Sequence, residues 1–264
     1  MDTRELANNI RMHVLKMANR AGTSHVGSCL SCADVLAVLY GEIMQYKPQE
    51  PDWEGRDRFI LSKGHAAAAL YATLAEVGFF PVGELNNYGQ PGSRLLGHAS
   101  HKVPGVEAST GSLGHGLSIG CGMAIANPES KVFALLSDGD LNEGSTWEAI
   151  MFAGQRKLYN LVAVVDWNRL QAMGESERIL DMQMLSRKVA EFGWTVRDVD
   201  GHNHNLLISA LTDVAEQGKG PCMIIAHTIK GKGVSWMEGD VRWHYRHPND
   251  DELDRALAEI RKHY

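Results

Sequence analysis

Residues 131–171 read KVFALLSDGDLNEGSTWEAIMFAGQRKLYNLVAVVDWNRLQ, and this stretch decides the fold. Val132 to Leu136 is a short apolar run that ends in a polar turn, and residues 142–157 then carry apolar side chains at helical spacing. A second apolar run, residues 161–165, ends in Asp166-Trp167-Asn168. The pattern therefore predicts a strand, a tight turn, a helix and a second strand, which is the unit from which parallel sheets are built.

Two polar side chains stand at the ends of these strands, Asp138 and Asn168. If the strands are parallel neighbours, both side chains reach the same crevice at the carboxyl edge of the sheet. A carboxylate, a carboxamide oxygen and a main-chain carbonyl suit Mg²⁺, which usually brings phosphate oxygens with it. Gly139 allows close backbone approach, and the helix start supplies N–H groups for a diphosphate. The alternative is a plain turn at Asp138-Gly139-Asp140 and a helix cap at Asn168, but the spacing of about thirty residues favours a Mg²⁺-diphosphate site.

Ser137 to Asp140, taken with Asn168, resembles the thiamine diphosphate fingerprint, and the neighbouring motifs resemble those of the transketolases. The resemblance runs from about Ser24 to His244. It implies a thiamine diphosphate-binding α/β fold, with a mostly parallel sheet and helices on both faces, as a single domain over residues 1–264. It stops where a full-length transketolase continues into its pyrimidine-binding and C-terminal domains. We therefore expect the N-terminal, diphosphate-binding subunit of a split transketolase.

Length and composition agree with one large α/β domain. The chain has 264 residues, of which 44% are hydrophobic and 22% charged, and its formal net charge of −6 gives no reason to expect nucleic acid. No apolar run approaches the roughly 20 residues of a membrane span, and the N-terminus lacks a signal-peptide core, so we predict no membrane partner and a cytoplasmic location. Cys29 and Cys32 form a C-x-x-C pair without a second pair, and we interpret them as packing residues.

Further segments alternate between strand and helix patterns, which supports a parallel sheet with helices on both faces. Strands are predicted at residues 58–62, 194–199 and 222–227, and helices at residues 3–19, 32–44, 66–77, 117–126, 181–192, 206–217 and 250–262. Residues 88–114 and 169–178 have no lasting periodicity and are predicted to be loops.

Two histidines are delivered to helix starts. The Gly- and Ser-rich loop at residues 21–31 contains His25, and Lys63-Gly64-His65 lies between a predicted strand and helix. A lone loop histidine is usually solvated. However, the S-H-x-G-x-x-L-S pattern around His25 resembles the transketolase loop that puts a histidine beside the reacting carbons. The run DRFILSKGH, which ends at His65, resembles the segment whose histidine contacts the cofactor diphosphate.

Two further histidines rest on the resemblance. Gly97-His98 resembles the family's G-H-P, with Ala99 in place of proline. The stretch VRWHYRHP at residues 241–248 resembles the segment with a histidine that touches both diphosphate and sugar. We assign His244 to that role, and the spacing leaves His247 as the alternative. We expect the four histidines to surround the reacting carbons, where they donate to the developing alkoxide or take a hydroxyl proton.

The resemblance also supplies the remaining cofactor contacts. Residues 111–116 resemble the family's G-P-L-G-Q-G, which implies that the main chain of Gly111, Ser112 and Leu113 brackets the cofactor rings; Ser112 replaces a proline. It implies that the carbonyl of Leu170 completes the Mg²⁺ shell of Asp138 and Asn168, and that Gly139 and Asn168 face the cofactor. Lys230 could lie near the diphosphate, although a solvated side chain is the interpretation we favour.

The implied activity is that of a transketolase-type transferase, which moves a two-carbon ketol unit from a ketose or ketose phosphate to an aldose or aldose phosphate with thiamine diphosphate and Mg²⁺. The family's activating glutamate belongs to a domain that this chain does not contain. We therefore expect a separately encoded C-terminal subunit with the pyrimidine-binding domain. We also expect an α2β2 assembly around a twofold dimer of this chain, in which the small residues of helix 117–126 allow close packing.

Two alternatives stay open. One is another thiamine diphosphate-dependent ketol synthase, such as a 1-deoxyxylulose-5-phosphate synthase-like enzyme; the run at residues 57–65 and the length of the chain argue against it. The other is a non-enzymatic cofactor-binding regulatory module. Such a module would have no need of four histidines at loop ends.

Overall fold

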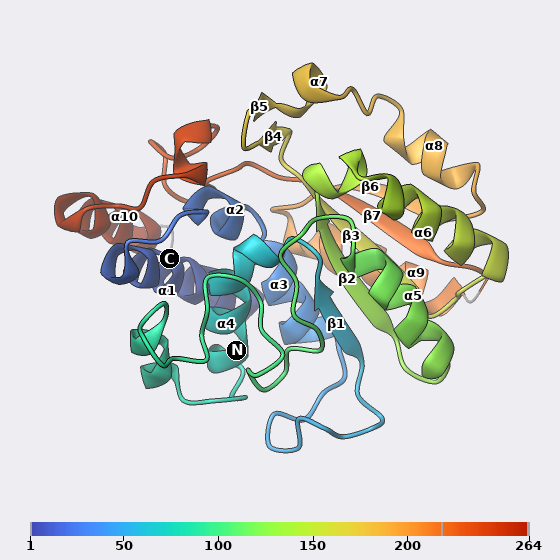
Figure 1. Ribbon diagram of the computed structural model, residues 1–264, viewed down its shortest axis with the longest axis horizontal. Coiled ribbons are helices and arrows are strands. Elements are labelled where there is room, and N and C mark those ends of the chain that lie inside the picture. Colours follow the sequence, from blue (N-terminus) through green and yellow to red (C-terminus); the bar gives the residue numbers. More distant parts are fainter. Residues whose placement is uncertain (1, 218, 263–264) are drawn as a thin grey trace.

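Over residues 2–217 and 219–262, which the computed structural model describes, the chain forms a five-stranded parallel sheet in the order β1-β2-β3-β7-β6 (Figure 1). The strands are β1 (Arg58–Leu61), β2 (Val132–Ser137), β3 (Leu161–Trp167), β6 (Thr195–Asp200) and β7 (Cys222–His227). Every pair in this sheet is parallel, so the predicted α/β fold is confirmed.

Helices connect the strands and extend the fold at both ends. They are α1 (Thr3–Ala21), α2 (Val26–Ser31), α3 (Ala33–Val38), α4 (Ala67–Glu76), α5 (Gly116–Ala126), α6 (Gly144–Arg156), α7 (Ser176–Ile179), α8 (Leu185–Ala190), α9 (His204–Gln217) and α10 (Asp250–Lys262). A π-helix, Leu39–Ile43, continues α3, and 3₁₀-helices lie at Gly64–Ala66, Val82–Asn87, Gly139–Asn142 and Val241–His244. No helix within the described ranges is long and apolar enough to cross a lipid bilayer.

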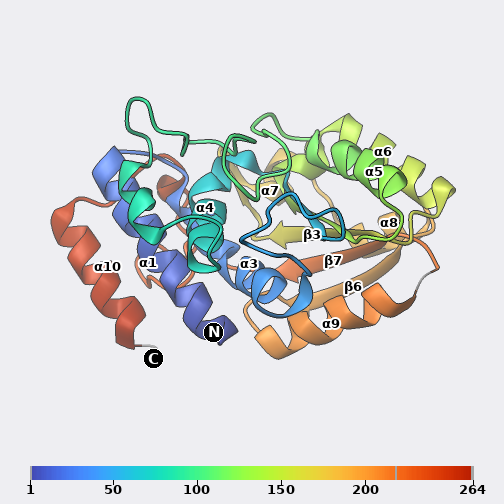
Figure 2. The same ribbon diagram turned by 90° about the horizontal axis from the view of Figure 1, so that it is seen from below.

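The strands pack into two cores, one on each face of the sheet. On β2, Phe133 and Leu135 belong to one core, and Ala134 and Leu136 belong to the other. Helices α1, α3, α4 and α9 cover the first core, and α5, α6 and α8 cover the second; Figure 2 shows α5, α6 and α8 on the opposite side of the strands from α9. Because both faces are buried, the strands are continuous apolar runs rather than alternating ones.

Three segments differ from their predicted structure. The loop expected at residues 21–31 contains α2 (Val26–Ser31), because these residues are buried and tertiary packing overrides their low helix propensity. The helix expected at residues 181–192 begins only at Leu185, because Asp181 Oδ1 accepts a hydrogen bond from the backbone N of Gln183 at 2.8 Å, and Met184 adopts a left-handed φ of 58°. The loop expected at residues 169–178 contains an antiparallel hairpin of β4 (Leu170–Gln171) and β5 (Gly174–Glu175) and the start of α7. Two-residue strands are too short to produce a periodic pattern.

The carboxyl ends of the strands meet at one edge of the sheet and position the site. Strands β2 and β3 are parallel neighbours with Ser137 opposite Asp166, as the sequence interpretation required. Asp138 and Asn168 therefore follow adjacent strands, Lys63 lies just beyond β1, and Thr228 follows β7. Such an edge is where open parallel sheets bind their ligands.

Candidate active site

A cavity of about 260 Å³ opens at this carboxyl edge. It brings together most of the residues that the sequence singled out. Its lining includes His25, His65, His98, His244, Gly111, Leu113, Asp138, Gly139, Asn168 and Leu170, together with Ser28, Lys63, Ser137, Gln171, Ala172 and Lys230. Ser112 is the exception among the expected residues, because it is exposed and does not line the cavity.

The four histidines form a cluster around His25. The centroid of its ring lies 4.9 Å from that of His244, 5.2 Å from that of His65 and 5.8 Å from that of His98. His25 precedes α2 in a left-handed conformation, with φ of 72°, and its backbone N donates to the carbonyl oxygen of His244 at 3.0 Å. This single contact ties the N-terminal loop to the 3₁₀-helix Val241–His244. His247, the alternative to His244, is exposed and lies outside the cavity lining.

Burial and nearby positive charges lower the pKa of three of these rings, His25, His65 and His244, and keep them neutral. Burial, the largest cause, acts together with His98, Lys230 and Lys63 to lower the pKa of His25 to about 4. Burial and then Lys230 lower the pKa of His244 to about 3, while burial and Lys63 hold the pKa of His65 well below its usual value. A neutral imidazole has one N–H donor and one acceptor, so each ring can give or take a hydrogen bond to a substrate hydroxyl.

Asp138 is buried and only half satisfied. Its Oδ2 accepts a hydrogen bond from Ser176 Oγ at 2.8 Å, whereas Oδ1 is buried with no partner among the described residues. Burial raises the pKa of Asp138 to about 7, against the opposing effect of the Ser176 hydroxyl. A buried carboxylate oxygen without a partner is costly, and a divalent cation would satisfy it. The donor set therefore fits Mg²⁺.

The other two expected metal ligands, Asn168 and Leu170, line the same cavity as Asp138. Asn168 Nδ2 donates to Asp166 Oδ2 at 3.3 Å, and the backbone N of Leu170 donates to Asn168 Oδ1 at 3.1 Å. Lys230 Nζ donates to the carbonyl oxygen of Leu170 at 2.8 Å. A carbonyl oxygen has two lone pairs, so the Leu170 oxygen can serve Lys230 and a cation together. Within the part of the chain that the structure describes, no group of three or more His, Cys, Asp or Glu side chains could hold a metal.

Sequence reasoning missed a buried ion pair behind these ligands. Lys63 is fully buried, pairs with Asp166 and donates to the carbonyl oxygen of Ser28 at 3.0 Å. Asp166 also accepts hydrogen bonds from the hydroxyls of Ser31 and Thr228. The available signal was a charged residue directly after each of two segments read as strands from the sequence, residues 58–62 and 161–165. Breaking such a buried pair would leave an uncompensated charge, so the pair with Asp166 holds Lys63 in the wall of the cavity.

Lys230 corrects one interpretation. A solvated side chain was favoured, but Lys230 is only 1% exposed and lies in the cavity wall. Its Nζ is 3.2 Å from His244 Nδ1. Burial and the charge of Lys63 lower the pKa of Lys230 to about 8. The interpretation of Cys29 and Cys32 as packing residues is confirmed, because both are buried free thiols.

Comparison with known proteins gives consistent matches over nearly the whole chain. The family model described as the thiamine diphosphate binding domain of transketolase matches residues 2–261. The chain is 40% identical over 254 residues to a protein of Phocaeicola vulgatus that is named as one subunit of apulose-4-phosphate transketolase, covering 95% of this chain and 90% of that protein. It is 39% identical over 267 residues to the 6-deoxy-6-sulfo-D-fructose transketolase subunit SqwG of a Clostridium species, covering 99% and 97%.

Solved structures agree with these matches. The crystal structure of transketolase from Campylobacter jejuni superimposes with a TM-score of 0.92 at 31% identity. The match covers 98% of this chain but 42% of that chain. The chain thus spans about two fifths of the solved enzyme, whereas it spans nearly the full length of the two subunits.

Proposed function

This chain belongs to the transketolase family, and we propose that it is the N-terminal, thiamine diphosphate-binding subunit of a two-component transketolase. As a transketolase-type transferase it moves a two-carbon ketol unit from a ketose to an aldose. The observation that carries the proposal is the cavity whose lining contains four histidines and the half-satisfied Asp138. We treat the chain as a single cofactor-binding domain.

Thiamine diphosphate, when bound, supplies a ring system that accepts the electron pair released on carbon–carbon cleavage. We assign Mg²⁺ to Asp138, Asn168 and the carbonyl of Leu170. The buried, unpartnered Oδ1 of Asp138 supports this assignment, because oxygen ligands with one negative charge suit that ion. We assign the diphosphate to the side of the cavity that carries Gly139 and His65.

The rings of the cofactor are assigned to the main chain of Gly111, Ser112 and Leu113. Gly111 and Leu113 line the cavity, which supports the assignment for these two. Ser112 is exposed, so we assign it a backbone contact only. Gly111 also packs closely on a catalytic candidate, because a Cβ at this position would lie 3.2 Å from His98 Cδ2.

The histidines are assigned to proton handling at the substrate. The side chains of His25, His65, His98 and His244 donate to an oxygen that gains negative charge or take a proton from a hydroxyl. The lowered pKa values of His25, His65 and His244 support this role, since a ring that is neutral at pH 7 can do both. Lys63 and Lys230 add positive charge that favours anionic groups in the cavity.

A separate partner subunit completes the enzyme. The two relatives are named as subunits of transketolases, which supports a partner. We propose that this partner carries the pyrimidine-binding domain, and that two copies of each chain form an α2β2 assembly. Exposed Ile125 on α5 and Phe152 on α6 support a contact between copies of this chain at these helices. The names of the relatives refer to phosphorylated and sulfonated sugars, and we propose phosphorylated or similarly anionic sugars as substrates.

The proposal is tested by reconstitution. The chain purified alone is expected to be inactive, and addition of the chain with the pyrimidine-binding domain should restore two-carbon transfer between a ketose and an aldose. Light scattering should give an assembly with two copies of each chain. Full activity of this polypeptide by itself would overturn the proposal of a two-component enzyme. Pyruvate decarboxylation would favour a synthase-like enzyme, and cofactor binding without activity with any partner would favour a regulatory module.

A cytoplasmic location stays a prediction.

A further inference from the structure

Lys230 reaches the candidate active site from a tight turn, residues 228–233, that follows β7. Its buried ammonium bridges the metal-binding side of the cavity and the histidine cluster, through the Leu170 carbonyl and His244 Nδ1. The side chain is closely packed as well, because a Cβ on Gly27 would lie 3.1 Å from Lys230 Cγ. The position of this ammonium therefore depends on where the backbone of the turn is held.

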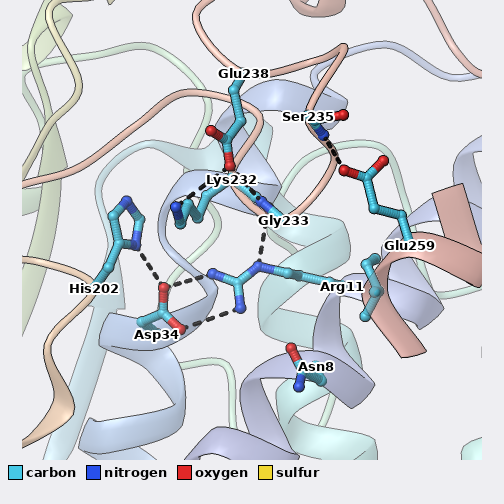
Figure 3. A pocket seen from close by; sticks show the side chains of 10 residues that line it. Asn8, Arg11, Asp34, His202, Lys232, Gly233, Ser235, Glu238 and Glu259 are labelled. Atoms are coloured by element: carbon cyan, nitrogen blue, oxygen red, sulfur yellow. Dashed lines mark hydrogen bonds and ion pairs between the residues drawn. The ribbon is translucent and has the colours of Figure 1, made fainter. Parts of the chain in front are cut away.

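A second cavity, of about 460 Å³, borders the same turn, and a charged network forms its wall (Figure 3). Arg11 from α1 and His202, which follows β6, converge on the carboxylate of Asp34 in α3. Arg11 donates to the two oxygens of Asp34 at 3.1 and 2.5 Å, and His202 Nδ1 lies 2.6 Å from Oδ2. His204 Nε2 lies 3.0 Å from Oδ1. The carboxylate is thus fully occupied by protein groups, which indicates a structural connection rather than a ligand site.

The network holds the turn at two points, one on each side of Lys230. The backbone N of Ile229 donates to His202 Nε2 at 2.8 Å, and Arg11 Nε donates to the carbonyl oxygen of Lys232 at 3.0 Å. Because His202 Nε2 accepts this hydrogen bond, its Nδ1 must carry the hydrogen that is donated to Asp34. The Asp34 carboxylate therefore accepts the hydrogen of the required His202 tautomer and also orients the guanidinium of Arg11.

Glycine makes this close arrangement possible. Gly233 has φ of 97°, and a Cβ there would lie 3.0 Å from Arg11 Cδ. Gly231 has φ of 84°, and a Cβ there would lie 2.3 Å from the carbonyl oxygen of Met237. The turn consequently packs closely against Arg11 on one side and Met237 on the other. Its backbone, and with it the position of Lys230, has little room to move.

We propose that His202 is a positioning residue: through Nε2 it fixes one side of the turn that places Lys230 in the active site, while Arg11 holds the other side. This inference rests on the proposed function, in which Lys230 lies beside a metal-binding carbonyl. Arg11 and Asp34 are each 5% exposed. Arg11, Asp34 and His202 are not among the residues that line the active-site cavity, so the network acts from behind the site.

A pair of isosteric replacements at His202 separates positioning from general stability. In His202→Asn the amide nitrogen takes the place of Nδ1, so the bond to Asp34 remains and the acceptor for Ile229 is lost. In His202→Gln the amide oxygen takes the place of Nε2, so the acceptor for Ile229 remains. Asp34→Asn is a poorer test, because it leaves the Arg11 guanidinium buried without its counter-charge.

The first readouts use the full chain without cofactor. In His202→Asn the amide of Ile229 should exchange with deuterium about tenfold faster than in the wild type, as for the loss of one hydrogen bond. Acetylation of Lys230 by an amine-reactive acetylating reagent, measured by mass spectrometry, should also be faster in His202→Asn than in the wild type. Both rates should stay near the wild-type values in His202→Gln. Equal acceleration in the two variants, or in neither, would overturn the proposal whatever the chain's function.

The second readout is the affinity of the assembled enzyme for thiamine diphosphate with Mg²⁺. We expect this affinity to fall about tenfold in His202→Asn and to change less than about threefold in His202→Gln. Faster exchange in His202→Asn with unchanged cofactor affinity would show that the turn is held but does not position Lys230 for this site, and would also overturn the proposal. Failure of the wild-type assembly to bind the cofactor would instead refute the proposed function, and the exchange and acetylation rates would still decide whether His202 holds Lys230 in place.

Discussion

The carboxylate of Asp140 lies against the backbone of Gly114, whose N–H donates to Oδ1 at 2.8 Å. This contact joins the loop expected to bracket the cofactor rings to the turn that carries Asp138. The same carboxylate accepts hydrogen bonds from Ser62 Oγ at 2.6 Å and from the backbone N of Ser137 at 2.8 Å. Asp140 is fully buried, so the ends of β1 and β2 and the ring loop share one buried anchor.

Replacement of Asp140 should therefore damage stability and cofactor binding together. In Asp140→Asn an amide N–H would face a site built from donors, and we expect a loss of about 2–4 kcal/mol in the free energy of unfolding. Urea denaturation and titration with thiamine diphosphate measure the two effects. The control is Asp213→Asn at an exposed position of α9, which should change neither. An Asp140→Asn variant of wild-type stability would refute the anchor.

Asp138→Asn should have opposite effects on binding and stability. It removes the charged metal ligand, so Mg²⁺-dependent binding of thiamine diphosphate should be lost. Burial raises the pKa of Asp138 from 3.8 to about 7, so its folded-state proton is lost as the pH rises through 7, and the ionised, half-satisfied carboxylate then destabilises the fold.

At pH 8 the cofactor-free Asp138→Asn chain should therefore be more stable than the wild type. The change in pKa sets a ceiling of about 4 kcal/mol for this gain. Thermal unfolding without Mg²⁺ measures it. A variant that retains metal-dependent binding would remove Asp138 from the metal site.

His65→Ala should lower turnover of the assembled enzyme about a hundredfold, as for loss of a positioned proton donor or acceptor. We expect a small change in melting temperature, because His65 lies at a loop end and lines a cavity. His101→Ala provides a matched control, because His101 is exposed and hydrogen-bonds Ser109 away from the site. A collapse in stability with His65→Ala would indicate a structural role instead.

Stability should fall with acidification through the histidine cluster. His25 and His244 have folded-state pKa values of about 4 and 3, below the ordinary value of 6.5, so the unfolded chain binds more protons between pH 6.5 and 4. Each such histidine adds at most about 1.4 kcal/mol per pH unit to the slope of stability against pH. Urea denaturation at pH 7, 6 and 5 should give a shallower slope for His244→Asn than for the wild type. Parallel slopes would contradict the lowered pKa of His244.

Local spacing was enough to predict the strands and the two polar residues at their ends. Asp138 and Asn168 could be placed together because each follows an apolar run that forms a strand, and because neighbouring parallel strands present their carboxyl ends at one edge. Ser112 fell outside the cavity, because a motif fixes the course of the backbone but not the direction of each side chain.

The remaining charges of the site depend on contacts between distant segments. Lys63 and Asp166 are 103 positions apart, and no local pattern connects them. Lys230 belongs to a glycine-rich segment of a kind that usually forms a solvated turn. Its side chain is instead buried, and it packs closely against Gly27 in α2. Burial of charge is decided by tertiary packing, so sequence periodicity could not reveal it.

The left-handed backbone of His25 limits what substitutions at this position can report. Side chains branched at Cβ are strongly disfavoured at φ of 72°, whereas asparagine and glycine adopt it readily, and proline cannot. In saturation mutagenesis of position 25, the valine, isoleucine, threonine and proline variants would consequently fail for conformational reasons, whatever their effect on the choice of sugar substrate. Directed evolution of substrate preference at this position can therefore use only a subset of the amino acids. Within that subset, asparagine is the replacement that removes the imidazole and keeps the left-handed backbone.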